Sequence, residues 1–169
     1  MTEATVELSE SNTVSETVHD GINNINYGSD DSYDLVPATY PITAGENSYE
    51  KWIRLHVSAM GDSNKIDNIQ IWKSAGAYVT GETIDTNLKT SGYSGATYAT
   101  PTQNESTVAT EPMPTADPTQ ANLGIGGSLS GNLTAIGYSD YWVSQLQTTV
   151  STPAGDVNQK TYTIQYDEQ

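Results

Sequence analysis

The sequence predicts an all-β protein, built as an antiparallel β-sandwich, on three observations. Several segments alternate apolar and polar side chains with the two-residue period of a strand. β-Branched and aromatic residues, which strands favour, dominate these segments. No stretch sustains apolar residues at the spacing of three and four that marks an amphipathic helix. A chain of 169 residues is long enough for one sandwich with an adequate core.

The alternation places strands along the chain and gives each strand an inner face. The expected strands are, in order, residues 5–8, 51–58, 66–73, 141–150 and 161–166. In the second of them Ile53, Leu55 and Val57 share one face, because successive side chains in a strand point to opposite sides. Trp52 and His56 are therefore expected on the other face.

Turn-forming residues lie between the stronger strands. Residues 61–64 (Gly-Asp-Ser-Asn) separate the second strand from the third, and residues 153–156 (Pro-Ala-Gly-Asp) separate the last two. Each of these two pairs is expected to form a hairpin of the sandwich. In the last strand, Tyr162, Ile164 and Tyr166 are expected to share one face.

Charge divides the chain unevenly. Of a formal net charge of −15, the first 50 residues carry −10, since they hold ten acidic residues and no Lys or Arg. We therefore predict an extended acidic N-terminal arm with short strands over residues 1–45 and a sandwich domain over residues 46–169. Two interpretations of the arm stay open: a solvated acidic surface that maintains solubility, or a segment that docks on a basic partner.

A long excursion, rich in Pro, Thr and Gly, is expected to interrupt the sandwich at about residues 74–137. It has few large aliphatic residues, and four prolines fall between residues 99 and 120. Because proline lacks the backbone N–H that a central strand needs, this part is expected to be extended. Loops of this length are typical of disordered or of functional segments.

Composition excludes several classes of protein. The six Lys and Arg residues cannot neutralise many phosphates, so we expect no nucleic-acid partner. The absence of Cys excludes thiol catalysis, thiolate metal sites and disulfides. No apolar run approaches the roughly 20 residues of a membrane helix, and no secretory signal is recognisable, so no membrane partner is expected. We expect a protein that is not an enzyme and has no cofactor.

Few residues suggest chemistry. His19 and His56 fall on different segments, and a structural or surface role is expected for both. Asp62, Asn64 and Asp67 offer side-chain oxygens at a spacing that opens calcium loops. Because this segment is short and leads straight into a strand, an Asx-rich turn is favoured, and the question of a metal stays open.

Two tryptophans are candidates for recognition. Trp52 and Trp72 alternate away from the apolar faces of their strands. Three interpretations stay open: the excursion covers both as a second small core, the indoles anchor a protein interface, or they form a platform for sugar rings.

Two parts of the chain resemble a known family. Residues 40–58, with Ser-Tyr-Glu-Lys-Trp before an alternating strand, and residues 66–73 (Ile-Asp-Asn-Ile-Gln-Ile-Trp-Lys) are similar to small β-sandwich virion proteins of tailed bacteriophages. Residues 139–147 and 162–168, which end in Tyr-Asp-Glu, resemble the closing hairpin of those proteins. The resemblance does not cover the acidic arm or the excursion.

The resemblance implies an immunoglobulin-like or jelly-roll-like sandwich in a virion that assembles in the host cytoplasm. It implies a non-enzymatic auxiliary capsid (decoration) protein that binds the major capsid protein or another virion protein as a homo-oligomer, with a trimer favoured. A tail or head-fibre component is one alternative, and a carbohydrate-binding or adhesin module is another. The expected contact residues are Glu3, Glu7, Glu10, Trp52, Trp72, Pro112 and Pro114.

Overall fold

The protein folds as an all-β structure, as the sequence predicts. A computed structural model describes residues 2–154 and 159–169, and every regular element among them is a strand. The strands are β1 (Thr5–Asn12), β2 (Thr17–Ile22), β3 (Lys51–Ala59), β4 (Ile66–Ala75), β5 (Glu82–Thr86), β6 (Glu111–Pro112), β7 (Asn132–Leu133), β8 (Gly137–Tyr138), β9 (Trp142–Thr148) and β10 (Thr161–Glu168). Within the described residues, no helix has the length and apolar character needed to span a bilayer.

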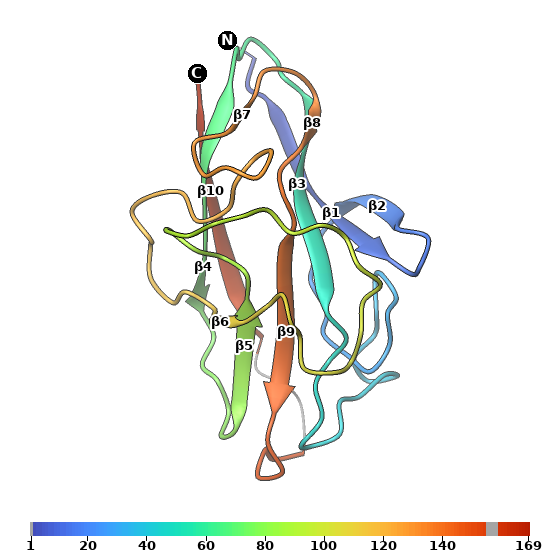
Figure 1. The fold of residues 1–169 in the computed structure, drawn as a ribbon. Coiled ribbons are helices and arrows are strands. Elements are labelled where there is room, and N and C mark those ends of the chain that lie inside the picture. Colours follow the sequence, from blue (N-terminus) through green and yellow to red (C-terminus); the bar gives the residue numbers. More distant parts are fainter. Residues whose placement is uncertain (1, 155–158) are drawn as a thin grey trace.

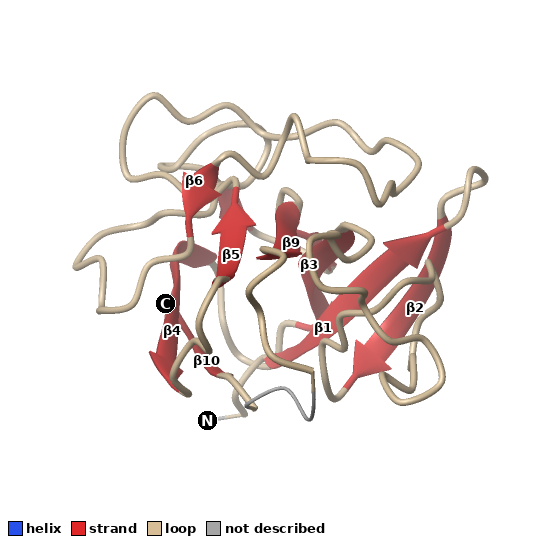
Figure 2. Ribbon diagram, turned by 90° about the horizontal axis from the view of Figure 1, so that it is seen from below, coloured by secondary structure: helices blue, strands red, loops and turns tan. Residues whose placement is uncertain are grey.

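The strands form two antiparallel sheets (Figures 1 and 2). The larger sheet has the order β2-β1-β3-β9-β5-β6, with β8 also paired to β3. The smaller sheet has the order β10-β4-β7. Because the two sheets are unequal, β1 and β2 extend beyond the smaller sheet, to the right in Figure 2.

The two sheets share one hydrophobic core. The larger sheet contributes Ile53 and Leu55 from β3 and Trp142 from β9, and the smaller sheet contributes Ile69 and Ile71 from β4. All five side chains are buried, so the sheets pack face to face as a β-sandwich. The partly buried side chains that complete this core from β10 are Tyr162, Ile164 and Tyr166.

Neither predicted hairpin forms. β3 and β4 are consecutive but belong to different sheets, and so do β9 and β10. The turn at residues 61–64 therefore carries the chain from one sheet to the other, and the turn predicted at 153–156 lies partly outside the described residues. Each strand pairs instead with a distant segment: β3 with β1 and β9, and β4 with β10. Alternation gives the face of a strand, but it does not give the partner strand.

The structure does not confirm a separate N-terminal arm over residues 1–45. β1 lies inside the larger sheet, between β2 and β3, and pairs with both. An acidic residue of this segment is part of the protein interior: the carboxylate of Glu10 is buried and pairs with the ammonium group of Lys51.

Residues 74–137 are not confirmed as an excursion from the sandwich. β5 lies between β9 and β6 in the larger sheet, and β7 pairs with β4 in the smaller one. Met113, Leu123 and Ile125 from this stretch are buried in the main core. Pro112 lies in β6, the edge strand of the larger sheet. Proline is tolerated there because an edge strand has a neighbour on one side only.

A second buried cluster covers the outer face of the larger sheet. It contains Trp52, Tyr141, Val143 and Ala109. The rings of Tyr98 and Tyr141 each lie 5.3 Å from the ring of Trp52, both edge-on. The segment that carries Tyr98 and Ala109 folds back over Trp52. For Trp52, this arrangement agrees with the interpretation that residues 74–137 cover the indole in a second small core.

Candidate functional site

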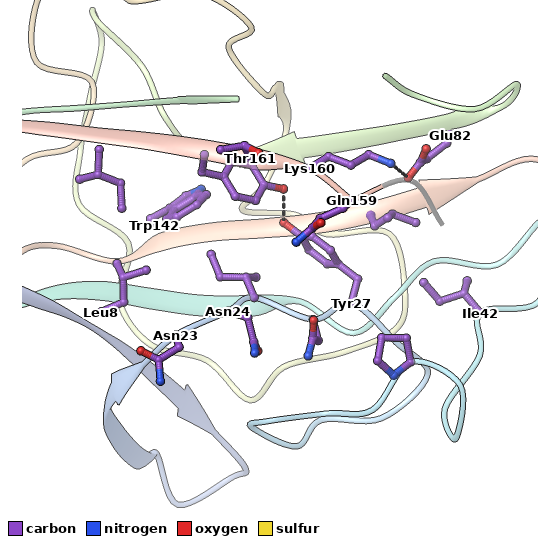
Figure 3. A pocket seen from close by; sticks show the side chains of 16 residues that line it. Leu8, Asn23, Asn24, Tyr27, Ile42, Glu82, Trp142, Gln159, Lys160 and Thr161 are labelled. Carbon is purple, nitrogen blue, oxygen red and sulfur yellow. Dashed lines mark hydrogen bonds and ion pairs between the residues drawn. The ribbon is translucent and has the colours of Figure 1, made fainter. Parts of the chain in front are cut away.

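A cavity of about 470 Å³, the intersheet cavity, opens between the two sheets beside β10 (Figure 3). Its walls come from β1, the segment at residues 23–27, β9 and the start of β10. The larger apolar side chains that line it are Leu8, Ile25, Ile42, Trp142, Leu146 and Ile164. An enclosure of this size and composition is typical of sites for small molecules.

Polar groups line the intersheet cavity as well. The hydroxyl of Tyr27 lies 2.9 Å from Ser144 Oγ and 3.2 Å from the hydroxyl of Tyr162. The ammonium group of Lys160 donates to Glu82 Oε1 at 2.5 Å, as the dashed line in Figure 3 marks. Burial raises the pKa of both tyrosines, so the phenols stay protonated and serve as hydrogen-bonding groups. The lining thus combines apolar surface with hydrogen-bonding groups.

A second group of side chains lies on the outer face of the larger sheet. Glu7, Asp20 and His56, which we call the His56 cluster, bring their oxygen and nitrogen atoms within 4.8 Å of one another. His56 Nδ1 lies 2.9 Å from Glu7 Oε1 and 3.5 Å from Asp20 Oδ1. The strand register brings these side chains together. Glu7 of β1 lies directly opposite His56 of β3. Asp20 of β2 lies opposite Ser9, two residues from Glu7 on the same face of β1.

Aromatic and cationic side chains surround the His56 cluster. The ring of Tyr138 stacks on the imidazole of His56, with 4.3 Å between their centres. The hydroxyl of Tyr138 donates to Asp20 at 3.2 Å, and burial together with the charge of Asp20 raises the pKa of this phenol. The guanidinium of Arg54 lies 4.2 Å from the centre of the same ring and 3.8 Å from a carboxylate oxygen of Glu16.

Two of the predicted contact residues, Trp52 and Glu10, are buried. Trp52 has no exposed surface, whereas a surface anchor was one of the interpretations for it. Glu10 was expected as a contact residue, but its carboxylate is buried and pairs with Lys51 inside the fold. Glu7 is half-buried and belongs to the His56 cluster.

The other predicted contact residues lie in different places. Glu3 and Pro112 are exposed, at the N-terminal end and in β6 respectively. Pro114 and Trp72 are half-buried. Because Trp72 lies on β4 of the smaller sheet and Trp52 on β3 of the larger, the two indoles do not form the platform that one interpretation required.

The segment with calcium-like spacing has other contacts. Asp62 Oδ2 accepts a hydrogen bond from the backbone N–H of Thr2 at 2.6 Å. Asp67 Oδ2 lies 2.7 Å from the ammonium group of Lys65, which opposes a cation at that position. These contacts favour the interpretation as an Asx-rich turn.

The sequence did not reveal either site. Alternation placed His56 correctly on the outer face, but Glu7 and Asp20 reach it only through strand partners that the sequence left open. The turn between β1 and β2 contains Thr13 and Glu16 with φ of 65° and 53°, although such turns are usually signalled by Gly or Asn. With that turn recognised, the pairing of Ser9 with Asp20 would follow, but the pairing of Glu7 with His56 across β1 and β3 would not.

Searches against known protein families, curated proteins and solved structures find no match for this chain.

Proposed function

We propose that the protein is a non-enzymatic structural component of a bacteriophage virion, an auxiliary capsid (decoration) protein that binds and stabilises the head shell. Its partner is the major capsid protein or another virion protein, and it acts as a homo-oligomer, with a trimer favoured. Within the sandwich class, the proposal includes an immunoglobulin-like or jelly-roll-like fold. A tail or head-fibre component is the nearest variant.

The observation that supports this proposal is the pairing of the segments that resemble virion proteins. These segments contain β3, β4, β9 and β10. β3 pairs with β9 in the larger sheet and β4 pairs with β10 in the smaller one, so segments far apart in the sequence lie side by side (Figure 1). The segments that carry the resemblance thus include strands from both sheets.

The mechanism of such a protein is mechanical. A protein that binds the assembled shell but not its dissociated subunits stabilises the shell by mass action. Many equivalent sites on one shell strengthen the attachment of an oligomer. A net charge of −15 favours docking on a basic surface and maintains solubility at high local concentration.

The test is to locate the chain in particles of the phage that encodes it. Antibodies against the chain should label the heads of purified virions in electron microscopy, and light scattering should show that the purified chain is a discrete oligomer. Label confined to the tails would select the tail variant. Absence of the chain from purified virions would contradict the proposal.

A carbohydrate-binding or adhesin module is the second candidate, and the intersheet cavity favours it. Tyr27 and Tyr162 supply aromatic groups there, Asn23 and Asn24 supply amides, and the fully buried Trp142 borders the cavity as a reporter. Titration with a panel of sugars should then change the tryptophan fluorescence, and Trp142→Phe should abolish the change. An unaltered spectrum with every sugar would count against this candidate.

A further inference from the structure

We propose that the His56 cluster is a binding site for a divalent transition-metal ion, with Zn²⁺ as its representative. The ligands are His56 Nδ1 and one carboxylate oxygen each from Glu7 and Asp20. The proposal does not depend on the virion role, because it uses only the geometry and charge of these three side chains.

The separations between the ligand atoms match those around a metal ion. With metal–ligand bonds of about 2.1 Å, neighbouring ligand atoms lie about 3.0 Å apart in an octahedron and about 3.4 Å apart in a tetrahedron. His56 Nδ1 lies 2.9 Å from Glu7 Oε1 and 3.5 Å from Asp20 Oδ1. All three ligand atoms fall within 4.8 Å of one another, so small side-chain rotations bring them onto one ion.

Each ligand comes from a different strand, and the three strands are neighbours. β1, which carries Glu7, is paired with β2 on one side and with β3 on the other. Backbone hydrogen bonds therefore fix the three attachment points relative to one another before any ion binds. A site preorganised in this way loses little conformational entropy on binding.

The charge of the His56 cluster also favours a cation. His56 Nδ1 lies within hydrogen-bond distance of Glu7 Oε1 and 3.5 Å from Asp20 Oδ1, and within the described part of the chain no Lys or Arg pairs with either carboxylate. Arg54, the nearest cation along β3, directs its guanidinium toward the rings of Tyr138 and Tyr141. A divalent ion brings the two positive charges that the two carboxylates lack.

Neighbouring groups hold the ligands in place. Ser9 Oγ donates to Asp20 Oδ1 at 2.6 Å, and the Tyr138 hydroxyl donates to the same carboxylate. The stacked ring of Tyr138 fixes the plane of the His56 imidazole. Outer contacts of this kind orient metal ligands and raise affinity in known sites.

The ligand set selects the class of metal. One imidazole nitrogen with two carboxylate oxygens suits zinc and its neighbours in the first transition row. Ca²⁺ and Mg²⁺ prefer an all-oxygen environment with more ligands. Three protein ligands also leave coordination positions for water or for a group from another molecule.

Calorimetric titration of the full chain with Zn²⁺, at neutral pH and physiological salt, tests the proposal. We expect one saturable site per chain, a rise in thermal stability with Zn²⁺, and binding that Ca²⁺ and Mg²⁺ do not compete away. His56→Ala should weaken Zn²⁺ binding by more than about tenfold, since even changes outside the ligand shell cost about 10–100-fold. Asp20→Asn, which preserves shape, should also weaken it.

His19→Ala is the matched control. His19 lies beside Asp20 on β2, but adjacent residues of a strand face opposite sides, and its ring stacks on Tyr33. This variant should bind Zn²⁺ with unchanged affinity. The proposal is overturned if the parent chain shows no saturable site, or if folded His56→Ala and Asp20→Asn variants, checked by circular dichroism, bind as tightly as the parent.

Discussion

Lys51 and Glu10 form an ion pair in which the ammonium nitrogen lies 2.8 Å from a carboxylate oxygen and both side chains are almost completely removed from water. The amide of Asn12 donates to the same oxygen, and the carbonyl of Ser32 accepts from Lys51. Glu10→Gln would leave the charge of Lys51 buried without its counter-charge. We expect the free energy of unfolding, measured by urea denaturation, to fall by about 3–5 kcal/mol.

An exposed pair provides the comparison. Lys89 lies 2.9 Å from Glu111, but both side chains remain well hydrated, with 37% and 44% of their surface exposed. Lys89→Ala should therefore change the free energy of unfolding by less than about 1 kcal/mol. Equal losses in the two variants would show that the Lys51–Glu10 pair is not buried in solution.

Trp52 and Trp72 should differ sharply in their contribution to stability. Trp52 is fully buried among Tyr141, Val143 and Ala109, so Trp52→Ala leaves a large hole and should cost about 3–5 kcal/mol. Trp72→Ala should cost clearly less, because its side chain is half-buried. Urea denaturation of both variants measures the difference, and a harmless Trp52→Ala would contradict the second buried cluster.

The faces of the strands could be predicted from the sequence, because side-chain period two is a local property. Ile53, Leu55 and Val57 were expected on one face of their strand and are all buried. Tyr162 and Ile164 were expected on the same face, and both pack against the core. The all-β class followed from the same local patterns.

The partners of the strands could not be predicted, because pairing depends on segments far apart in the chain. The turns at 61–64 and 153–156 resemble hairpin turns in composition, yet the strands that flank each of them lie in different sheets. Glu10 was assigned to a surface arm for the same reason. Its partner Lys51 lies 41 residues further along the chain, and no local pattern indicates that the two side chains pair. Both candidate sites depend on these long-range pairings.

Gln145 shows how the stretch expected to be an excursion is held to the sandwich. This fully buried side chain on β9 donates to the carbonyls of Ser48 at 3.0 Å and Asn104 at 2.7 Å. Its Oε1 accepts from the backbone N–H of Ser106 at 2.9 Å. Gln145→Leu removes that acceptor from a buried N–H, and the free energy of unfolding should fall by about 1–3 kcal/mol or more.

Limited proteolysis gives a second measure of the role of Gln145. The Gln145→Leu variant should be cut faster near residues 102–106, because that segment loses its attachment to β9. Gln147→Leu, at a half-buried position two residues further on the same strand, should leave the cleavage rate close to that of the parent chain. Faster cleavage in the Gln147 variant alone would contradict the role assigned to Gln145.

The tyrosines should make folding stability sensitive to alkaline pH. Burial raises the pKa of Tyr78 and of Tyr141 from 10.0 to about 12. In the unfolded chain these phenols release their protons near pH 10, whereas the folded chain retains them. The stability they contribute is therefore complete below pH 10 and decreases as the pH rises from 10 toward 12.

Tyrosinate absorbance, followed with circular dichroism, should show a fraction of the tyrosines ionising only as the β signal is lost. Tyr141→Phe should reduce the loss of stability in this range, and ionisation of every tyrosine near pH 10 with the fold intact would contradict the burial of these rings.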